Sequence, residues 1–216
     1  MRYFFLLLSF LLLFLVSTQA QKTVPYPINS FHFLRFNPLG LLDPVEGNLS
    51  FGAEYHLQKS WSVAMDASWI FYSRHFSEAN ASGFMLRPAI RTYRGPRQNR
   101  FFELEFQYKQ VDHHLHDWIG RDFVNGVPSY EELTSFTYRK QVFGFHFKAG
   151  SIFPLTKNKR FWMEAYVGLG ARYRHFSTVN QPYNTFSPLS DIFEGDFTLG
   201  WTAALPLGMR LMWRLD

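Results

Sequence analysis

The chain has 216 residues, a formal net charge of +5, no cysteine, 47% hydrophobic residues and 19% aromatic residues. Without cysteine, disulfides and a lipid anchor on cysteine are both excluded, and a small disulfide-stapled secreted domain is not expected. The charge is modest and the basic residues alternate with aromatic ones rather than forming a patch. We therefore expect no binding to nucleic acid.

The first twenty residues predict a cleaved signal peptide. Arg2 supplies a positive start, residues 4–16 are apolar except Ser9, and small residues lead up to Ala20. This apolar run is too short to cross a bilayer of about 30 Å as a helix. We expect export with cleavage near Ala20, which leaves a single domain over residues 21–216.

Beyond the signal peptide, apolar residues alternate with polar ones instead of gathering in long runs. A period of two sends successive side chains to opposite faces of a strand. The clearest case is Phe161–Ser177, whose odd positions up to Tyr173 are all apolar, while Glu164 and Arg172 lie in the opposite phase. The first strand leaves its facing open, because Phe33 and Leu34 are adjacent. The expected strands are 30–37, 48–57, 61–71, 83–93, 102–109, 135–153, 161–177 and 197–213.

The connections between these strands alternate in length. Short turns are expected near 58–60, 95–100 and 154–160, and longer irregular connections at 74–82, 112–134 and 175–196. Short turns on one side and long loops on the other are typical of outer-membrane barrels, as are two girdles of aromatic residues. Near the short turns lie Trp61, Phe102, Phe161 and Trp213, and near the long loops lie Trp69, Phe84, Tyr108, Tyr173 and Phe197.

These patterns predict an all-β fold, an eight-stranded antiparallel up-and-down transmembrane β-barrel in the outer membrane of a Gram-negative bacterium. A lipocalin-like soluble barrel is the structural alternative, and its apolar face would point inward. For the membrane barrel we expect a monomer without cofactor that contacts outer-membrane lipid and lipopolysaccharide. Periplasmic chaperones and the barrel-assembly machinery would be its partners during export.

The polar phase of the strands carries many charged residues that would face the lumen. An eight-stranded barrel is only just wide enough for side chains to fill it, and unpaired buried charges are costly. We therefore predict a salt-bridged plug, with a narrow pore for small solutes or protons as the alternative. The predicted lumenal charge network comprises Glu54, Asp66, Arg87, Arg91, Glu103, Glu105, Lys109, Lys148, Glu164, Arg172 and Arg210.

Residues 112–117, Asp-His-His-Leu-His-Asp, combine histidines and carboxylates at close spacing. Such side chains can converge on one metal ion. The segment lacks cysteine and has no second cluster to complete a site. We expect an exposed polar loop here and no metal site.

Four segments resemble a known family. They are Asn37-Pro38-Leu39 after the first strand, the glycine-containing strand that ends near Glu54-Tyr55, Gly83–Arg94, and Glu164–Arg174. Together they are similar to the uncharacterised family of small eight-stranded bacterial outer-membrane barrels, whose domain has no assigned function. The resemblance implies the barrel and the outer membrane, and it implies no activity. The chain departs from the general barrel pattern at its end, where Asp216 replaces the usual terminal aromatic residue.

A second, local resemblance concerns His175-Phe176-Ser177, which continues the outward phase of its strand. It is similar to the His-x-Ser element of lipid A 3-O-deacylases, eight-stranded barrels with a lipid-facing Ser-His-Glu triad. That likeness implies Ser177 as nucleophile, His175 as its base and Glu194 or Asp191 as the orienting acid. However, Thr178 stands where an asparagine is usual, and the same tripeptide recurs at residues 75–77.

We therefore expect a non-enzymatic structural or surface-interaction protein of the bacterial envelope. A lipid A-modifying hydrolase is the alternative function, and a narrow channel for small solutes is the third.

Overall fold

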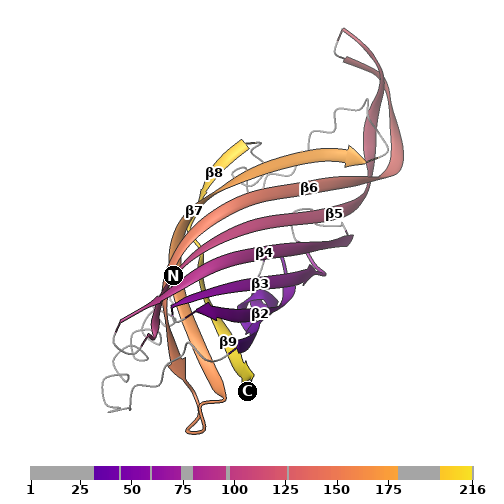
Figure 1. Cartoon of the computed structure of the whole chain (residues 1–216). Helices are drawn as coiled ribbons and strands as arrows, with labels where there is room; N and C mark the ends of the chain where they lie inside the picture. The colour runs from indigo at the N-terminus through magenta and orange to yellow at the C-terminus, as the bar shows by residue number, and fades with distance from the viewer. Residues whose placement is uncertain are drawn as a thin grey trace, which may run out of the picture.

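The computed structural model describes residues 32–43, 45–58, 60–73, 80–95, 98–125, 127–179 and 200–215. In chain order the elements are β1 (His32–Asn37), the 3-10 helix η3 (Pro38–Leu42), β2 (Asn48–Gln58), β3 (Trp61–Ile70), β4 (Asn80–Arg94), β5 (Arg100–Val124), β6 (Val127–Pro154), β7 (Phe161–Val179), β8 (Gly200–Ala204) and β9 (Leu207–Leu215). Figure 1 shows the strands as one strongly curved sheet. No helix within these ranges is long and apolar enough to cross a membrane. The predicted signal peptide, residues 1–20, lies outside the described residues.

The sheet closes on itself. Its order is β6-β5-β4-β3-β2-β1-β9-β7-β8, and the ring is completed by pairing of β6 with β7. Both β8 and β9 pair with β7 in one common register, so they occupy a single strand position. The predicted all-β fold with an antiparallel ring of eight strand positions is confirmed.

The last strand position is interrupted, and the prediction of one continuous strand over 197–213 is wrong. The ladder with β7 runs from Gly170↔Ala204 to Val167↔Leu207 and is broken between them, at Leu205 and Pro206. Proline has no backbone N–H to donate to a ladder, so a break at this position follows from the sequence. Residues 197–199 lie outside the described residues.

The two faces of the sheet differ as the alternation predicts. Along β3, Trp61, Val63 and Met65 are exposed, whereas Ala64 and Asp66 are buried. The same alternation settles the facing of β1, since Phe33 and Arg35 are buried and Leu34 is exposed. The apolar phase therefore covers the outside of the ring, and most of the charged phase lies inside it. This is the reverse of a lipocalin-like barrel, whose apolar face lines the interior.

The segment 112–134 is not the irregular connection that the sequence predicts. It belongs to the hairpin of β5 and β6, which pair without interruption of the strands as far as Val124↔Val127. The neighbouring strands end earlier, at Asn80↔His114 for β4 and at Thr137↔Val179 for β7. Residues 115–136 therefore form a two-stranded ribbon, here called the ribbon, that projects beyond the rest of the barrel (Figure 1).

Buried apolar residues occupy both ends of the interior. The larger cluster lies near the short turns, the start of β1 and the end of β9, and a smaller one of Ile70, Met85 and Val111 lies toward the opposite end. On β4 the buried Arg87 and Arg91 lie between Met85 of the smaller cluster and Tyr93 of the larger one, whereas the buried Lys140 is opposite Val111. The larger cluster consists of Phe33, Tyr93, Phe101, Ile152, Trp162, Tyr166 and Met212.

Candidate functional site

Arg91, on the inward face of β4, is a centre of the charged interior. Its side chain is completely buried. Nη1 donates to Glu164 Oε2 at 2.7 Å and to Glu54 Oε2 at 3.1 Å, and Nε donates to Glu103 Oε2 at 2.9 Å. The guanidinium also lies 4.0 Å from the centroid of the Phe101 ring. One cation thus links carboxylates from three other strands, β2, β5 and β7.

Arg210, on β9, is the second centre. Its Nη1 donates to Glu164 Oε1 at 2.7 Å, and its Nη2 lies 3.1 Å from Glu105 Oε2 and 3.2 Å from Asp66 Oδ2. Lys148 joins through Glu105, with Nζ 2.5 Å from Oε2. The charge on each group therefore has an opposite partner inside the barrel, which offsets the cost of removing it from water.

Arg35 and Tyr93 also contact these charged groups, and the sequence reasoning missed both. Arg35 Nη2 lies 3.2 Å from Asp66 Oδ2 and 3.7 Å from Glu103 Oε2. The Tyr93 hydroxyl donates to Glu54 and accepts from Arg91. Arg35 was missed because Phe33 and Leu34 are adjacent and both apolar, so the sequence of β1 does not show which positions face inward. The strict alternation of β2, its antiparallel neighbour, could have supplied that phase.

These contacts define the central ion network. It takes in eight of the eleven residues that the sequence assigned to the lumen, together with Arg35. These carboxylates and cations pair with one another across strands, although Arg35 Nε and Nη1, Asp66 Oδ1 and Arg210 Nε have no hydrogen-bond partner. The pairs fill space and fix strand positions. The arrangement presents no free nucleophile. The central ion network consists of Arg35, Glu54, Asp66, Arg91, Glu103, Glu105, Lys148, Glu164 and Arg210.

Inward-facing glycines make room for the large interior side chains. Gly208 is directly opposite Tyr166, and a Cβ there would lie 2.4 Å from the Tyr166 hydroxyl oxygen. Gly170 is opposite His146, and a Cβ there would lie 2.5 Å from His146 Cδ2. Glycine in a strand often marks such a close approach. The Tyr166 ring in turn packs 4.5 Å from the Arg210 guanidinium, so these glycines support the central ion network.

Arg87, Lys109 and Arg172, also assigned to the lumen, lie outside the central ion network. They line a cavity of about 360 Å³ on its side toward the long loops. Arg87 Nη2 donates to Ser50 Oγ at 2.8 Å. Lys109 donates to Glu46, which also accepts from Lys140 at 3.0 Å. Glu46 and Lys140 were missed. Glu46 precedes β2, where no alternation shows which way a side chain faces. Lys140 could have been predicted, because it shares the inward phase of Lys148.

His175 and Ser177 lie on one face of β7, past Tyr173. His175 is exposed and Ser177 is half-buried, and their partners on β6 are Gln141 and Arg139. The two acids that the resemblance implies, Glu194 and Asp191, lie outside the described residues, as does the second copy of the tripeptide at 75–77. The described structure therefore places two members of the hypothetical triad side by side on a strand.

The histidines of residues 112–117 alternate between faces of β5. His113 is buried, whereas His114 and His116 are exposed and contact Thr137 Oγ1 at 3.2 Å and Ser135 Oγ at 2.9 Å. The strand thus directs the three imidazoles to opposite sides. Within the described ranges, no group of three or more His, Cys, Asp or Glu side chains could hold a metal ion.

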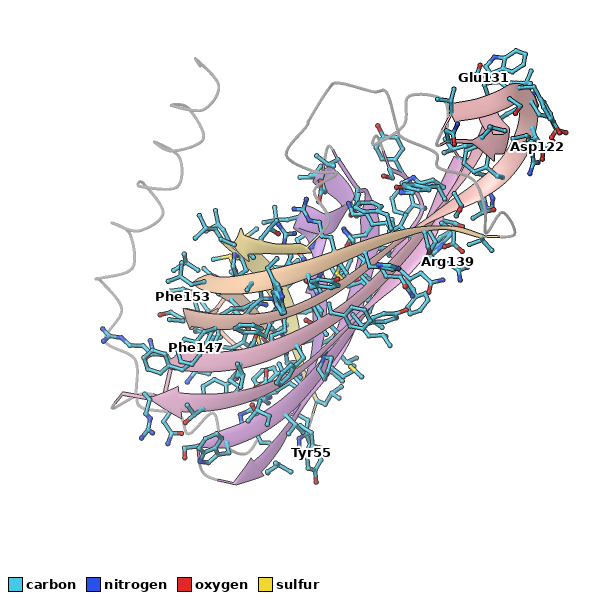
Figure 2. All side chains as sticks on the ribbon, turned by 90° about the horizontal axis from the view of Figure 1, so that it is seen from above. Tyr55, Asp122, Glu131, Arg139, Phe147 and Phe153 are labelled. Atoms are coloured by element: carbon cyan, nitrogen blue, oxygen red, sulfur yellow. The ribbon has the colours of Figure 1, made fainter. Side chains whose placement is uncertain are left out.

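Asp112, at the start of the same segment, is engaged by Arg139 at the base of the ribbon. Nε and Nη2 of Arg139 each donate to the carboxylate at 2.7 Å. These hydrogen bonds raise the pKa of Arg139 above its usual value, so the guanidinium stays charged. Figure 2 shows Arg139 between the barrel and the far end of the ribbon, which Asp122 and Glu131 mark.

Comparison with known families gives one result. The family model described as "Protein of unknown function (DUF3575)" matches residues 37–192. The chain belongs to this family. The matched region runs from η3 to beyond β7 and so includes most of the strands of the ring. It contains every residue of the central ion network except Arg35 and Arg210. No curated protein and no solved structure matches the chain.

Proposed function

We propose that this DUF3575 protein is an integral β-barrel of a bacterial outer membrane, with a structural or surface-interaction role and no enzymatic activity. One observation carries the proposal. The outside of the ring is apolar at strand after strand, whereas the inside holds the central ion network. Such a polarity suits a closed barrel surrounded by lipid.

Aromatic side chains on the outside support the same proposal. Near the short turns, Phe161 and Trp213 pack with ring centroids 5.0 Å apart. Toward the long loops, Tyr108 contacts both Phe84 and Phe143, at 5.8 and 5.0 Å between centroids. Tyr and Trp favour the two membrane–water interfaces, so these two bands would mark the borders of the bilayer.

The filled interior supports a structural role over a channel. The larger apolar cluster lies across the end near the short turns, and the central ion network lies above it. We expect no step conductance when the purified protein is added to planar bilayers. Discrete current steps would reject the sealed barrel and favour the narrow channel.

The ribbon supports a role in surface interaction. It carries exposed apolar residues, including Trp118, Tyr130 and Leu133, on a segment with no neighbouring strand in the described structure. With the chain ends at the periplasmic side, the ribbon would stand on the cell surface.

Fractionation of cells that express the full chain tests the location. We expect the protein in the outer-membrane fraction, resistant to carbonate extraction and with heat-modifiable mobility in SDS gels. Recovery in the soluble periplasmic fraction, or a mobility that heating does not change, would contradict the proposal.

A further inference from the structure

Arg87 is a buried cation that forms no ion pair with a carboxylate within the described structure. Its exposed fraction is 8%, its Nη2 donates to Ser50 Oγ at 2.8 Å, and its Nε is buried without a hydrogen-bond partner. Asp66 lies opposite Arg87 in the ladder but turns toward Arg35 and Arg210, each at 3.2 Å. None of the described carboxylates forms an ion pair with Arg87. A buried charge in this state favours binding of an anion.

Arg87 lines the cavity of about 360 Å³ described above. That volume lies in the range of small-molecule sites, roughly 300–1,000 Å³. Lys109, Lys148 and Arg172 also line the cavity, together with the acids Asp43, Glu46 and Glu105. Glu46 already accepts from Lys109, and Glu105 from Lys148. Asp43, the third acid, is exposed and accepts from the backbone N–H groups of Val45 and Glu46. None of the three forms an ion pair with Arg87, so its guanidinium can take a ligand, and its fork geometry suits phosphate or carboxylate.

Within the described residues, the wall beside this cavity lacks a complete strand ladder. Strand β1 ends at Asn37, and η3 takes its place between β2 and β9. Strand β8 pairs with β7 and with no other described strand, and the break at Leu205–Pro206 follows it. This part of the wall, between η3 and the β8–β9 break, is here called the seam.

Leucines at the seam face both the cavity and the outside. Leu39, Leu205 and Leu207 line the cavity, yet they are 40%, 76% and 75% exposed. Leu41 and Leu42 of η3 are exposed beside them. The cavity thus lies next to the apolar outer surface of the barrel, with leucine side chains at the border between the two.

We propose that the cavity binds the anionic head group of an amphiphile, a phosphate or carboxylate on an alkyl chain. The head group sits on Arg87, and the chain leaves through the seam along Leu39, Leu205 and Leu207. The anion supplies the ion pair that Arg87 lacks, while the leucines take the hydrocarbon out of water. This proposal concerns the barrel itself and does not depend on the membrane in which the protein resides.

The test is titration calorimetry of the full chain, purified in dodecyl maltoside, with decyl phosphate as the probe. Three matched probes separate the contributions: inorganic phosphate has no chain, decanol has no charge, and decyltrimethylammonium has the opposite charge. Arg87→Gln removes the cation, Arg87→Lys keeps it, and Arg121→Gln removes a cation from the ribbon as a control. Heat-modifiable mobility checks the fold of each variant.

We expect decyl phosphate to bind the unaltered chain more tightly than any matched probe. Arg87→Gln should weaken it about tenfold or more, as expected for hydrogen bonds to a charged group, whereas Arg87→Lys should retain part of the affinity and Arg121→Gln all of it. Equal affinity in Arg87→Gln would overturn the proposal. Equal binding of inorganic phosphate would overturn the amphiphile and leave a free anion as the ligand. If Arg87→Gln does not fold, equal binding of decyl phosphate and decyltrimethylammonium to the unaltered chain would overturn it.

Discussion

Arg91 and Arg87 lie four residues apart on the same face of β4, yet they have opposite surroundings. Arg91 contacts Glu54, Glu103 and Glu164, whereas Arg87 contacts the neutral Ser50 and borders the cavity. The interior therefore has two regions. In the central ion network each charged group has an opposite partner on another strand, whereas at the cavity Arg87 forms no ion pair in the described structure. Natural proteins tend to give up stability where a site needs an unsatisfied group.

The largest expected loss of stability is that of Arg91→Met. The change leaves three buried carboxylates short of a cation, and removing one partner of a buried pair costs about 3–5 kcal/mol. Urea unfolding in lipid vesicles, followed by tryptophan fluorescence, measures the free energy of unfolding. The matched control is Arg121→Met, which breaks the exposed pair with Glu132 at 2.9 Å and should cost about 1 kcal/mol or less. Similar losses in the two variants would mean that the central ion network does not stabilise the barrel.

The next largest loss of stability is expected when a glycine beside the central ion network is replaced by a larger residue. Gly208→Val places a side chain where the Tyr166 ring lies, and overpacking of this kind costs about 1–3 kcal/mol. The same unfolding experiment applies. Combining Gly208→Val with Tyr166→Leu should recover part of the loss, because the smaller residue gives the valine room. No recovery in the double variant would show that Tyr166 is not the neighbour that matters.

Arg87→Met is the direct counterpart of Arg91→Met, and only a small effect on stability is expected from it. It removes a buried cation that lacks an ion pair in the described structure. The free energy of unfolding should therefore fall by no more than about 1 kcal/mol, or should rise. A loss as large as that of Arg91→Met would place Arg87 in the same class as Arg91. The proposed anion site would then lose its basis.

The smallest expected effect is that of substitutions at His175 and Ser177, which should leave the acylation of lipid A unchanged. Ser177→Ala and His175→Ala, expressed in cells, should give the same lipid A acylation pattern as the unaltered chain and as cells without the protein. Mass spectrometry of lipid A makes the comparison. A deacylated species that appears with the unaltered chain and disappears in both variants would contradict the non-enzymatic proposal and favour the hydrolase.

Strands with one outward and one inward face could be predicted from the sequence, because each face has its own polarity. This is why the phases of β3 and β7 and most members of the central ion network were identified. The ribbon was missed because exposed residues occur on both of its faces, so no strict alternation marks it. The sequence does hold a signal, since Asn125-Gly126 between two valines is typical of a tight hairpin turn, and Val124 pairs with Val127.

The cavity could not have been predicted from the same pattern. Alternation gives the face of a side chain but not its partner, so it could not separate Arg87 from Arg91. That difference depends on Asp66 turning toward Arg35, on the end of β1 at Asn37 and on the position of Glu46. All three are set by contacts between segments distant in the sequence. The proline at 206 was a visible sign that the last strand would break.

Cysteine labelling tests the membrane barrel most directly, since the chain contains no cysteine of its own. Single variants Val167→Cys, on the exposed face of β7, and Asp122→Cys, in the ribbon, are treated in intact cells with a membrane-impermeant maleimide. We predict rapid labelling of Asp122→Cys, and no labelling of Val167→Cys until SDS dissolves the membrane and unfolds the barrel. Rapid labelling of Val167→Cys in intact cells would contradict a lipid-facing outer surface and with it the proposed membrane barrel.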